Sequence, residues 1–256
     1  MRFKGKAGII TGGSGGIGKA TAKKFLEGGA KVALVDINED ALKETKKELQ
    51  SLGDVMTITA DVSKEDDVKH YVETTKKEFG RIDFFFNNAG IEGKTHDFND
   101  TPVEEFDKVI GINLRGVFLG MKYVAPIMIE QKSGSIINTS SVAGLGGFPG
   151  ITPYVASKHG VAGLTKNGAL EYAPYNVRVN SIHPAPIDTR MMRSVEAGMN
   201  PDDAEAAKKG IEQMIPLGRY GQSEEIADLV AFLASDESTY ISGSQYRIDG
   251  SMGAKA

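Results

Sequence analysis

The chain has 256 residues, a length that one α/β domain fills without dividing, and no Pro-, Gly- or Ser-rich linker interrupts it, so we expect a single domain over residues 1–256. Its formal net charge of −4 argues against binding to phosphate backbones, and we expect no nucleic-acid partner. It contains no cysteine, which excludes disulfides, thiolate catalysis and cysteine-based zinc sites, and its four histidines lack the spacing of metal ligands, so we expect no metal.

The first residues lead into an apolar run and reach Gly12 and Gly13 too early for the apolar region of a signal peptide. No apolar stretch approaches the roughly 18 residues that are needed to span a membrane. We therefore expect a cytoplasmic protein that has no membrane partner.

Short apolar runs alternate with helix-like segments along the whole chain. The runs are nearly continuous, as in parallel strands covered on both faces, and occupy residues 7–11, 31–35, 55–59, 82–86, 135–139, 177–182 and 245–248. The main helix-like segments occupy residues 16–27, 39–52, 64–79, 103–130, 152–172 and 223–234. This alternation predicts an α/β fold, a Rossmann-type doubly wound parallel β-sheet of about seven strands with helices on both faces, whose functional residues lie at the carboxyl ends of the strands.

A glycine-rich turn follows the first predicted strand and opens the first helix. Glycines permit a tight turn and a close backbone approach, and the helix N-terminus presents free N–H groups to a pyrophosphate. A flexible loop has the same composition, but the position between strand and helix favours a dinucleotide site. The predicted cofactor contacts in this turn are Gly12, Ser14, Gly15, Gly16, Ile17 and Gly18.

The second predicted strand leads to Asp36, about 20 residues after the glycines, where a carboxylate can accept hydrogen bonds from a ribose diol. A 2′-phosphate would meet this carboxylate at close range, and no arginine or lysine stands in the glycine turn or at Ile37 to neutralise it. The sequence therefore predicts NAD rather than NADP, with Asp36 and Ile37 at the cofactor. The alternative is that Asp36 only caps the following turn.

Two further loops follow the third and fourth predicted strands. Asp61 can bond the adenine amino group, with Val62 beside it, or it can cap the next helix, and the sequence leaves both open. The small side chains around Asn88, Ala89 and Gly90 let the backbone pass close to a ribose, although an Asn-Asn turn held by its own amides fits the same residues.

Tyr154 and Lys158 lie four residues apart in a predicted helix and therefore share a face. A tyrosine acts as a base near neutrality only if its pKa falls by roughly 2 to 3 units, or about 3 to 4 kcal/mol. One cation roughly 4 Å away contributes on the order of 4 kcal/mol at an effective dielectric of about 20, so Lys158 is sufficient in size. An ordinary surface pair has the same spacing, and the other motifs decide between the two interpretations.

Together these motifs resemble those of the short-chain dehydrogenase/reductase family, and the resemblance covers residues 5–250. It is carried, in chain order, by Thr11, Gly12, Gly16 and Gly18, then Asn87 to Gly90, then Tyr154 and Lys158. The resemblance implies an NAD-dependent enzyme that interconverts a secondary alcohol and a ketone by hydride transfer.

The resemblance also implies a role for each catalytic residue. Tyr154 is the general acid and base, and Lys158 lowers its pKa and bonds the nicotinamide ribose. Ser141, with Ser140 as the alternative, donates a hydrogen bond to the substrate oxygen. Asn113 holds a water that connects Lys158 to solvent, and the alternative for Asn113 is an amide exposed in mid-helix.

One loop departs from the family pattern, because Ala185 stands between Pro184 and Pro186 where the family has glycine. A residue before proline favours extended backbone, which needs no glycine, so the loop keeps its path while the added Cβ narrows the space beside the nicotinamide. By position, Pro184 and Ala185 contact the cofactor, the Ile187 backbone meets the carboxamide, and the Thr189 hydroxyl meets a phosphate. Thr189 can instead cap the next helix.

Residues 190–216 form an insertion that covers the substrate in the family. Methionines adapt to irregular apolar shapes, so Met192 and its neighbours favour an apolar or cyclic secondary alcohol, although ordinary packing explains them as well. The predicted substrate contacts are Ser141, Tyr154, His96, Leu145, Phe148 and Met192.

Two other functions stay open. One is a 3-oxoacyl-(acyl-carrier-protein) reductase, although such enzymes usually favour NADPH and use a basic docking patch of which Lys132 supplies only a part. The other is a non-catalytic NAD-binding module that senses redox state. Family members are commonly tetramers, and the small residues Ala156, Gly160 and Gly163 suit close packing between copies, so we expect a homotetramer.

Overall fold

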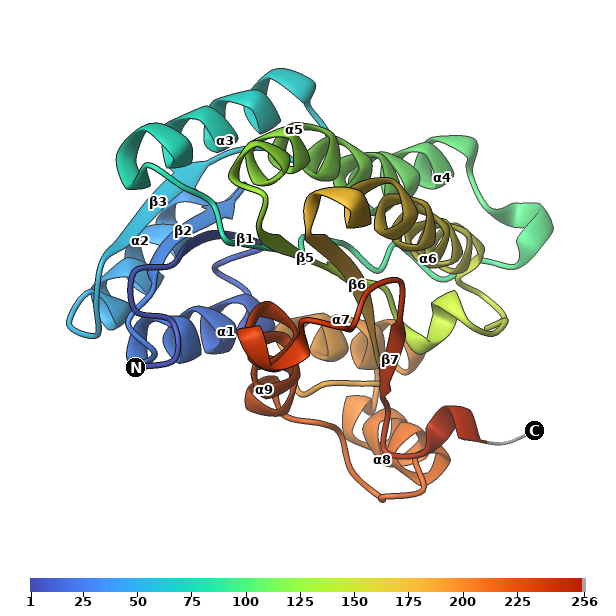
Figure 1. The fold of residues 1–256 in the computed structure, drawn as a ribbon. Helices are drawn as coiled ribbons and strands as arrows, with labels where there is room; N and C mark the ends of the chain where they lie inside the picture. Colours follow the sequence, from blue (N-terminus) through green and yellow to red (C-terminus); the bar gives the residue numbers. More distant parts are fainter. Residues whose placement is uncertain (255–256) are drawn as a thin grey trace.

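The computed structural model describes residues 1–254, and these contain a seven-stranded parallel sheet with the strand order β3-β2-β1-β4-β5-β6-β7 (Figure 1). The strands are β1 (Ala7–Thr11), β2 (Lys31–Asp36), β3 (Val55–Thr59), β4 (Phe84–Asn87), β5 (Gly134–Thr139), β6 (Val177–Pro184) and β7 (Gln245–Ile248). The predicted Rossmann-type doubly wound sheet is confirmed.

Helices cover both faces of the sheet (Figure 1). The α-helices are α1 (Gly16–Glu27), α2 (Glu39–Leu49), α3 (Glu65–Phe79), α4 (Val103–Ile110), α5 (Gly116–Gln131), α6 (Thr152–Tyr172), α7 (Arg190–Met199), α8 (Ala204–Met214) and α9 (Ser223–Ala234). One part of the core lies between the sheet and α3, α5 and α6, and the other lies between the sheet and α1, α2 and α9.

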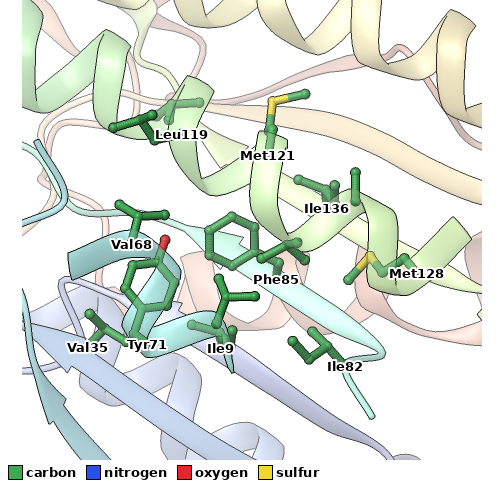
Figure 2. Packing of buried hydrophobic residues seen from close by; sticks show 14 of the residues in the cluster. Ile9, Val35, Val68, Tyr71, Ile82, Phe85, Leu119, Met121, Met128 and Ile136 are labelled. Carbon is green, nitrogen blue, oxygen red and sulfur yellow. The ribbon is translucent and has the colours of Figure 1, made fainter. Parts of the chain in front are cut away.

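The first part of the core explains why the strand sequences are almost continuously apolar. Tyr71 of α3, Phe85 of β4 and Ile9 of β1 are fully buried and pack with Met121 and Met128 of α5 (Figure 2). All five residues of β1 are buried, because helices press on the strand from both sides.

The second part of the core depends on a glycine in β1. A Cβ at Gly8 would lie 2.2 Å from the Phe84 ring, so only glycine leaves room for that ring. Phe84 stacks on Phe25 of α1 with ring centroids 4.0 Å apart, and this contact joins α1 to the sheet.

The structure corrects the single helix predicted over residues 103–130. Helix α4 ends at Ile110, a π turn spans Gly111–Arg115, and α5 begins at Gly116. Single π turns inside helices often occur at functional sites. This one contains Asn113, which is buried.

Several boundaries also differ from the prediction, for example those of α2 and β4. Helix α2 ends at Leu49 rather than at residue 52, where a turn follows. Strand β4 begins at Phe84 rather than at Ile82, because the Gln131 side chain binds the backbone of Ile82, accepting from its N–H at 3.0 Å and donating to its carbonyl at 2.7 Å.

The continuous helical segment Val103–Gln131 has 29 residues, with a mean hydropathy of 1.2 over its most apolar window. By length and composition alone it is long enough to cross a membrane, contrary to the expectation from the sequence. Half of that window is buried inside the protein, as in a helix that packs on the sheet.

The carboxyl ends of the strands meet at one edge of the sheet, because all strands point the same way. The strand order reverses between β1 and β4, where doubly wound sheets form a ligand crevice. The loops that follow β1, β4, β5 and β6 carry the glycine turn, Asn88, Ser141 and Ala185, so the fold gathers the predicted site residues at this edge.

Candidate active site

The N-terminus of α1 is suited to an anion. Gly15 is its N-cap, no side chain caps this end, and the first turn holds no acidic residue. Helices α2, α3 and α9 instead carry two or three acidic residues in their first turns. The free N–H groups and the positive end of the α1 dipole therefore fit a pyrophosphate.

The glycine turn packs too tightly for side chains. Gly12 has a φ of +64°, and a Cβ there would lie 3.1 Å from the Cα of Ala89. A Cβ at Gly18 would lie 2.2 Å from the Gly12 carbonyl oxygen. A Cβ at Gly16 would lie 3.2 Å from Cγ2 of Thr189, which places Thr189 beside the start of α1, where the phosphate is predicted.

Thr11 joins the glycine turn to the loop after β4. Its Oγ1 accepts the N–H groups of Asn88 at 2.9 Å and Ala89 at 3.0 Å, and Asn88 Nδ2 donates to the Thr11 carbonyl at 3.1 Å. Thr139 at the end of β5 donates to Asn88 Oδ1 at 3.3 Å. The Asn88 side chain therefore braces two strand ends instead of closing its own turn.

Asp36 serves two local roles. Its Oδ2 accepts the Ser14 hydroxyl at 2.6 Å and the Ser14 N–H at 3.1 Å, and its Oδ1 accepts the Asn38 N–H at 3.2 Å. The predicted turn cap is thus present, together with a brace on the glycine turn. A carboxylate has about four acceptor positions, so one stays open for a ribose hydroxyl. Ile37 beside it is exposed.

Asp61 holds the turn after β3 rather than the helix that follows. Its Oδ1 accepts the Ser63 N–H at 3.0 Å and the Ser63 hydroxyl at 2.7 Å, whereas the N-cap of α3 is Lys64. Oδ2 stays open for the predicted adenine contact, apart from Lys64 Nζ at 3.9 Å. Val62 beside it is buried.

Tyr154, Lys158 and Ser141 come together from α6 and from the loop after β5. Lys158 Nζ lies 5.4 Å from the centroid of the Tyr154 ring, and the Ser141 side chain lies close enough to the phenol to lower its pKa. The Ser140 hydroxyl instead donates to the Lys158 carbonyl at 2.8 Å. Ser141 is therefore the serine that faces the phenol.

The electrostatics of the phenol differ from the simple expectation. Burial raises the pKa of Tyr154 above its ordinary value, the charge of Glu92 acts in the same direction, and the nearby Ser141 side chain opposes both. Burial also lowers the pKa of Lys158 to about 8, and its ammonium donates to the Thr139 carbonyl at 2.8 Å. Lys158 by itself therefore does not bring the phenol pKa near neutrality, because its charge is desolvated and lies over the ring.

Asn113 is fully buried, which rules out an amide exposed in mid-helix. Its Oδ1 accepts the Ile91 N–H at 2.8 Å, and its Nδ2 donates to the Ile91 carbonyl at 2.8 Å and to Ser157 Oγ at 3.2 Å. Both amide donors are used, and Oδ1 keeps one acceptor position for the predicted water. A Cβ at Gly90 would meet Asn113 Oδ1 at 3.2 Å and Lys158 Nζ at 3.6 Å, so the two residues border the same space.

The backbone at Ala185 does not need a glycine. The φ of Ala185 is outside the left-handed region, and its N–H donates to the Ile248 carbonyl at 3.2 Å. Thr189 is the N-cap of α7, but its hydroxyl donates to the Ile187 carbonyl at 3.2 Å and does not cap the helix. The Pro184 carbonyl at the end of β6 accepts from the Ser141 hydroxyl at 3.4 Å, which links the loop after this strand to the predicted catalytic serine.

The predicted substrate contacts fall into two groups. His96 donates its N–H to the Gly150 carbonyl at 3.0 Å, so its loop lies against the loop that carries Phe148. Leu145 is 43% exposed, as a wall residue of an open site would be. Met192 on α7 packs instead against a small cluster of Ile211, Ile215 and Tyr220, and its contact with substrate stays a prediction.

Several residues at the site were not singled out from the sequence. Thr139 is a polar end to an apolar strand, which is a usable signal, and Glu92 is a lone acid in the loop after Gly90. Ser157 gave no signal, because its contact with Asn113 joins residues 44 positions apart.

The site thus combines the titratable phenol of Tyr154, the hydroxyl of Ser141 and the buried ammonium of Lys158. They lie at the same edge of the sheet as the glycine turn, which fits a dinucleotide. A family profile described as enoyl-(acyl carrier protein) reductase matches residues 12–252. Levodione reductase of Leifsonia aquatica is 45% identical over 256 residues, which cover 99% of this chain and 96% of that protein. The chain belongs to the short-chain dehydrogenase/reductase family.

Other members of the family match over similar lengths. Cyclohexanol dehydrogenase of Acinetobacter sp. (strain SE19) is 40% identical, with 99% of this chain and 97% of that protein covered. The 3-oxoacyl-(acyl-carrier-protein) reductase of Thermotoga maritima is 43% identical, with 98% and 99% covered.

Solved structures agree with these matches. The crystal structure of levodione reductase superposes with a TM-score of 0.98 at 44% identity and covers 100% of both chains. The structure of NAD⁺-bound xylitol dehydrogenase gives a TM-score of 0.92 at 36% identity, covering 97% of this chain and 99% of that one. The predicted family and fold are confirmed, and the protein is an oxidoreductase of this family.

Proposed function

We propose that this short-chain dehydrogenase uses NAD(H) to interconvert a secondary alcohol and a ketone, and that its substrate is apolar or cyclic. The observation that carries the proposal is the meeting of Tyr154, Ser141 and Lys158 at the carboxyl edge of the sheet. This edge also holds the glycine turn and the uncapped end of α1, which fit a dinucleotide.

The residues divide the chemistry of the reaction. Bound NAD⁺ supplies the hydride acceptor. Tyr154 as phenolate takes the hydroxyl proton while the carbinol C–H bond gives up its hydride, and the alcohol leaves as a ketone. Ser141 donates a hydrogen bond to the substrate oxygen, where charge develops. Because burial raises the phenol pKa, Tyr154 is protonated at neutral pH and is poised to give its proton to a ketone.

The preference for NAD rests on the second strand. Asp36 is held in place by Ser14 and keeps one acceptor position for a ribose hydroxyl. A 2′-phosphate would stand against this carboxylate. The NAD⁺-bound state of xylitol dehydrogenase supports the same cofactor here.

The substrate class rests on the apolar character of the predicted wall. Leu145 and Phe148 follow Ser141 in the loop after β5, and both retain exposed surface. The names of two relatives, levodione reductase and cyclohexanol dehydrogenase, support a cyclic ketone or alcohol.

A 3-oxoacyl-(acyl-carrier-protein) reductase is the second candidate, and the 43% identity to the Thermotoga maritima enzyme favours it. Such an enzyme needs a basic surface for its acidic carrier. Lys132 is exposed at the end of α5, but Asn176, which donates to its carbonyl at 3.1 Å, carries no charge, and the residue before Asn176 is Tyr175 rather than a basic residue. The second candidate therefore has less support than the first.

The proposal is tested with Tyr154→Phe, which removes the exchangeable proton and little else. We expect turnover to fall at least about 100-fold, the usual contribution of a general acid or base, while NADH affinity is kept. Tyr240→Phe at a fully exposed site is the matched control and should behave as wild type. Near-normal turnover in Tyr154→Phe would reject the assignment.

The same assay identifies the substrate class. Wild-type protein is offered cyclic, aliphatic, steroid and sugar ketones and an acyl thioester, and NADH consumption is followed. Turnover of the thioester above the cyclic ketones would select the second candidate. Tight NADH binding without turnover on any substrate would favour the redox-sensing module.

We also propose a cytoplasmic homotetramer. Phe118 on α5 and Leu170 on α6 are exposed apolar side chains, and a Cβ at Gly163 would meet no atom of another element within 4 Å among residues 1–254, so this side of the protein offers an apolar surface to another copy. Light scattering on the purified protein should give four times the chain mass.

A further inference from the structure

His183 lies on β6 and is completely buried, so it touches neither solvent nor substrate. Its Nδ1 lies 2.9 Å from the Ser141 carbonyl oxygen, and its Nε2 lies 2.9 Å from Ser181 Oγ. Both ring nitrogens therefore have partners, and one partner is the backbone of the serine proposed to bind the substrate oxygen.

The partners determine which nitrogen carries the proton. The Ser141 carbonyl can only accept, so Nδ1 must donate to it. A hydroxyl can donate or accept, and the Ser181 hydroxyl donates to Nε2 when the ring is neutral. Burial lowers the pKa of His183, the hydrogen bond to Ser141 opposes this, and the charges of Lys158, His159 and Lys166 add to the lowering. The neutral ring with hydrogen on Nδ1 fits all of these contacts.

Ser141 needs such support because it lies beyond the end of β5. Its carbonyl accepts two bonds, from the Gly144 N–H at 2.8 Å and from His183. The Gly144 bond belongs to the same short turn as Ser141 and moves with it. The His183 bond is the one of the two that fixes this turn to the neighbouring strand β6.

We propose that His183 is a positioning residue that sets the Ser141 hydroxyl relative to Tyr154 through the Nδ1–H bond to the Ser141 carbonyl. The inference rests on the proposed role of Ser141. Two other bonds tie this segment to β6, from the Ser140 N–H to the Ile182 carbonyl at 2.9 Å and from the Ser141 hydroxyl to the Pro184 carbonyl at 3.4 Å. Loss of the His183 bond therefore frees the Ser141 carbonyl rather than the whole turn, and the rotation of this peptide moves the hydroxyl donor away from the substrate oxygen. Small displacements of a positioned group are costly, since about 1 Å can reduce turnover about 100-fold.

Two amide variants separate positioning from packing. The amide nitrogen of asparagine reaches the place of Nδ1, whereas that of glutamine reaches the place of Nε2. His183→Asn should therefore keep kcat within about threefold of wild type, and His183→Gln should lose about 10-fold to 100-fold in kcat. The affinity for NADH should stay within about twofold in both, because the His183 side chain is buried and bonds Ser141 and Ser181, neither of which is a predicted cofactor contact.

A second background tests whether the effect passes through Ser141. In Ser141→Ala the hydroxyl to be positioned is missing, so adding His183→Gln should cost less than about twofold more. Equal losses in the Asn and Gln variants would overturn the inference. A full Gln effect that persists in Ser141→Ala would also overturn it.

The tautomer gives a readout that needs no variant and no substrate. Nitrogen-15 NMR of the wild-type protein should show His183 with its hydrogen on Nδ1, and hydrogen on Nε2 alone would overturn the inference even if His183→Gln fails to fold. This measurement is independent of the proposed function, which instead fails if the wild-type protein turns over no alcohol or ketone.

Discussion

Several of the side chains proposed to bind or react are held by a neighbour from another part of the chain. Lys158 on α6 donates to Thr139 at the end of β5, and Asp36 after β2 is bonded to Ser14 in the glycine turn. The reacting residue types were predictable, because a phenol, an ammonium and a carboxylate at these spacings are typical of few kinds of site. Their partners were not, since each pair joins positions that only the folded sheet brings together.

The bond between Asp36 and Ser14 leads to a prediction on cofactor choice. Asp36→Ala removes a charged acceptor from the ribose, and a hydrogen bond of this kind contributes about 1.5 to 3 kcal/mol. We therefore expect the ratio of kcat/KM for NADPH over NADH to rise at least about tenfold. Steady-state kinetics with both cofactors measures it.

Ser14→Ala is the matched control for this prediction. It removes the hydroxyl that braces the carboxylate but leaves the carboxylate itself. The control should keep the preference for NADH even where its total activity falls. An unchanged cofactor ratio in Asp36→Ala would refute the role of the carboxylate.

Among the secondary-structure elements, the strands and the helices that cover the sheet were predictable, because buried strands and amphipathic helices leave distinct periodic patterns. The π turn was not, since its residues are as compatible with a regular helix as those around it. Helices α7 and α8 were predicted only as an insertion over residues 190–216. These two helices pack on each other through the small cluster around Tyr220, which is separate from the two main parts of the core.

The packing of α1 on the sheet depends on Gly8, and this is testable. Gly8→Ala places a Cβ where the Phe84 ring lies, and overpacking of a core costs about 1 to 3 kcal/mol. Urea unfolding should show a loss of that size in the free energy of unfolding.

Gly210→Ala on α8 provides the comparison. A Cβ at Gly210 meets no atom within 4 Å, and alanine is the better helix former by up to about 1 kcal/mol. This variant should be as stable as wild type or more stable. A Gly8→Ala protein with wild-type stability would mean that the Phe84 ring moves aside without cost.

For the molecule as a whole, the proposed catalytic edge contains a buried charge. Lys158 is 3% exposed, and its pKa of about 8 lies below the value of 10.5 that applies in the unfolded chain. Between these two values the unfolded chain binds more protons than the folded one, so the free energy of unfolding rises with pH. The ammonium therefore destabilises the fold at neutral pH.

The size of this effect is measurable against Lys158→Met, which removes the titrating group. From pH 7.5 to pH 9.5 the wild type, without NAD, should gain about 2 kcal/mol in the free energy of unfolding relative to the variant. Burial raises the pKa of Tyr154, and because both proteins keep Tyr154, its contribution cancels in the comparison. Parallel pH profiles for the two proteins would show that Lys158 does not titrate in this window.

The π turn at Gly111–Arg115 makes chain length itself a functional variable. Deleting one residue there would restore an uninterrupted α-helix, and would leave composition and hydropathy almost unchanged. The two halves of the long helix would keep facing as they do, because the π turn takes up its extra residue locally, but the side chains inside the turn would change direction. The carboxamide of Asn113 would then turn away from Ile91 and Ser157. In a family alignment, a single-residue gap at this position would therefore mark proteins that have lost the hydrogen bonds of Asn113 to these two residues.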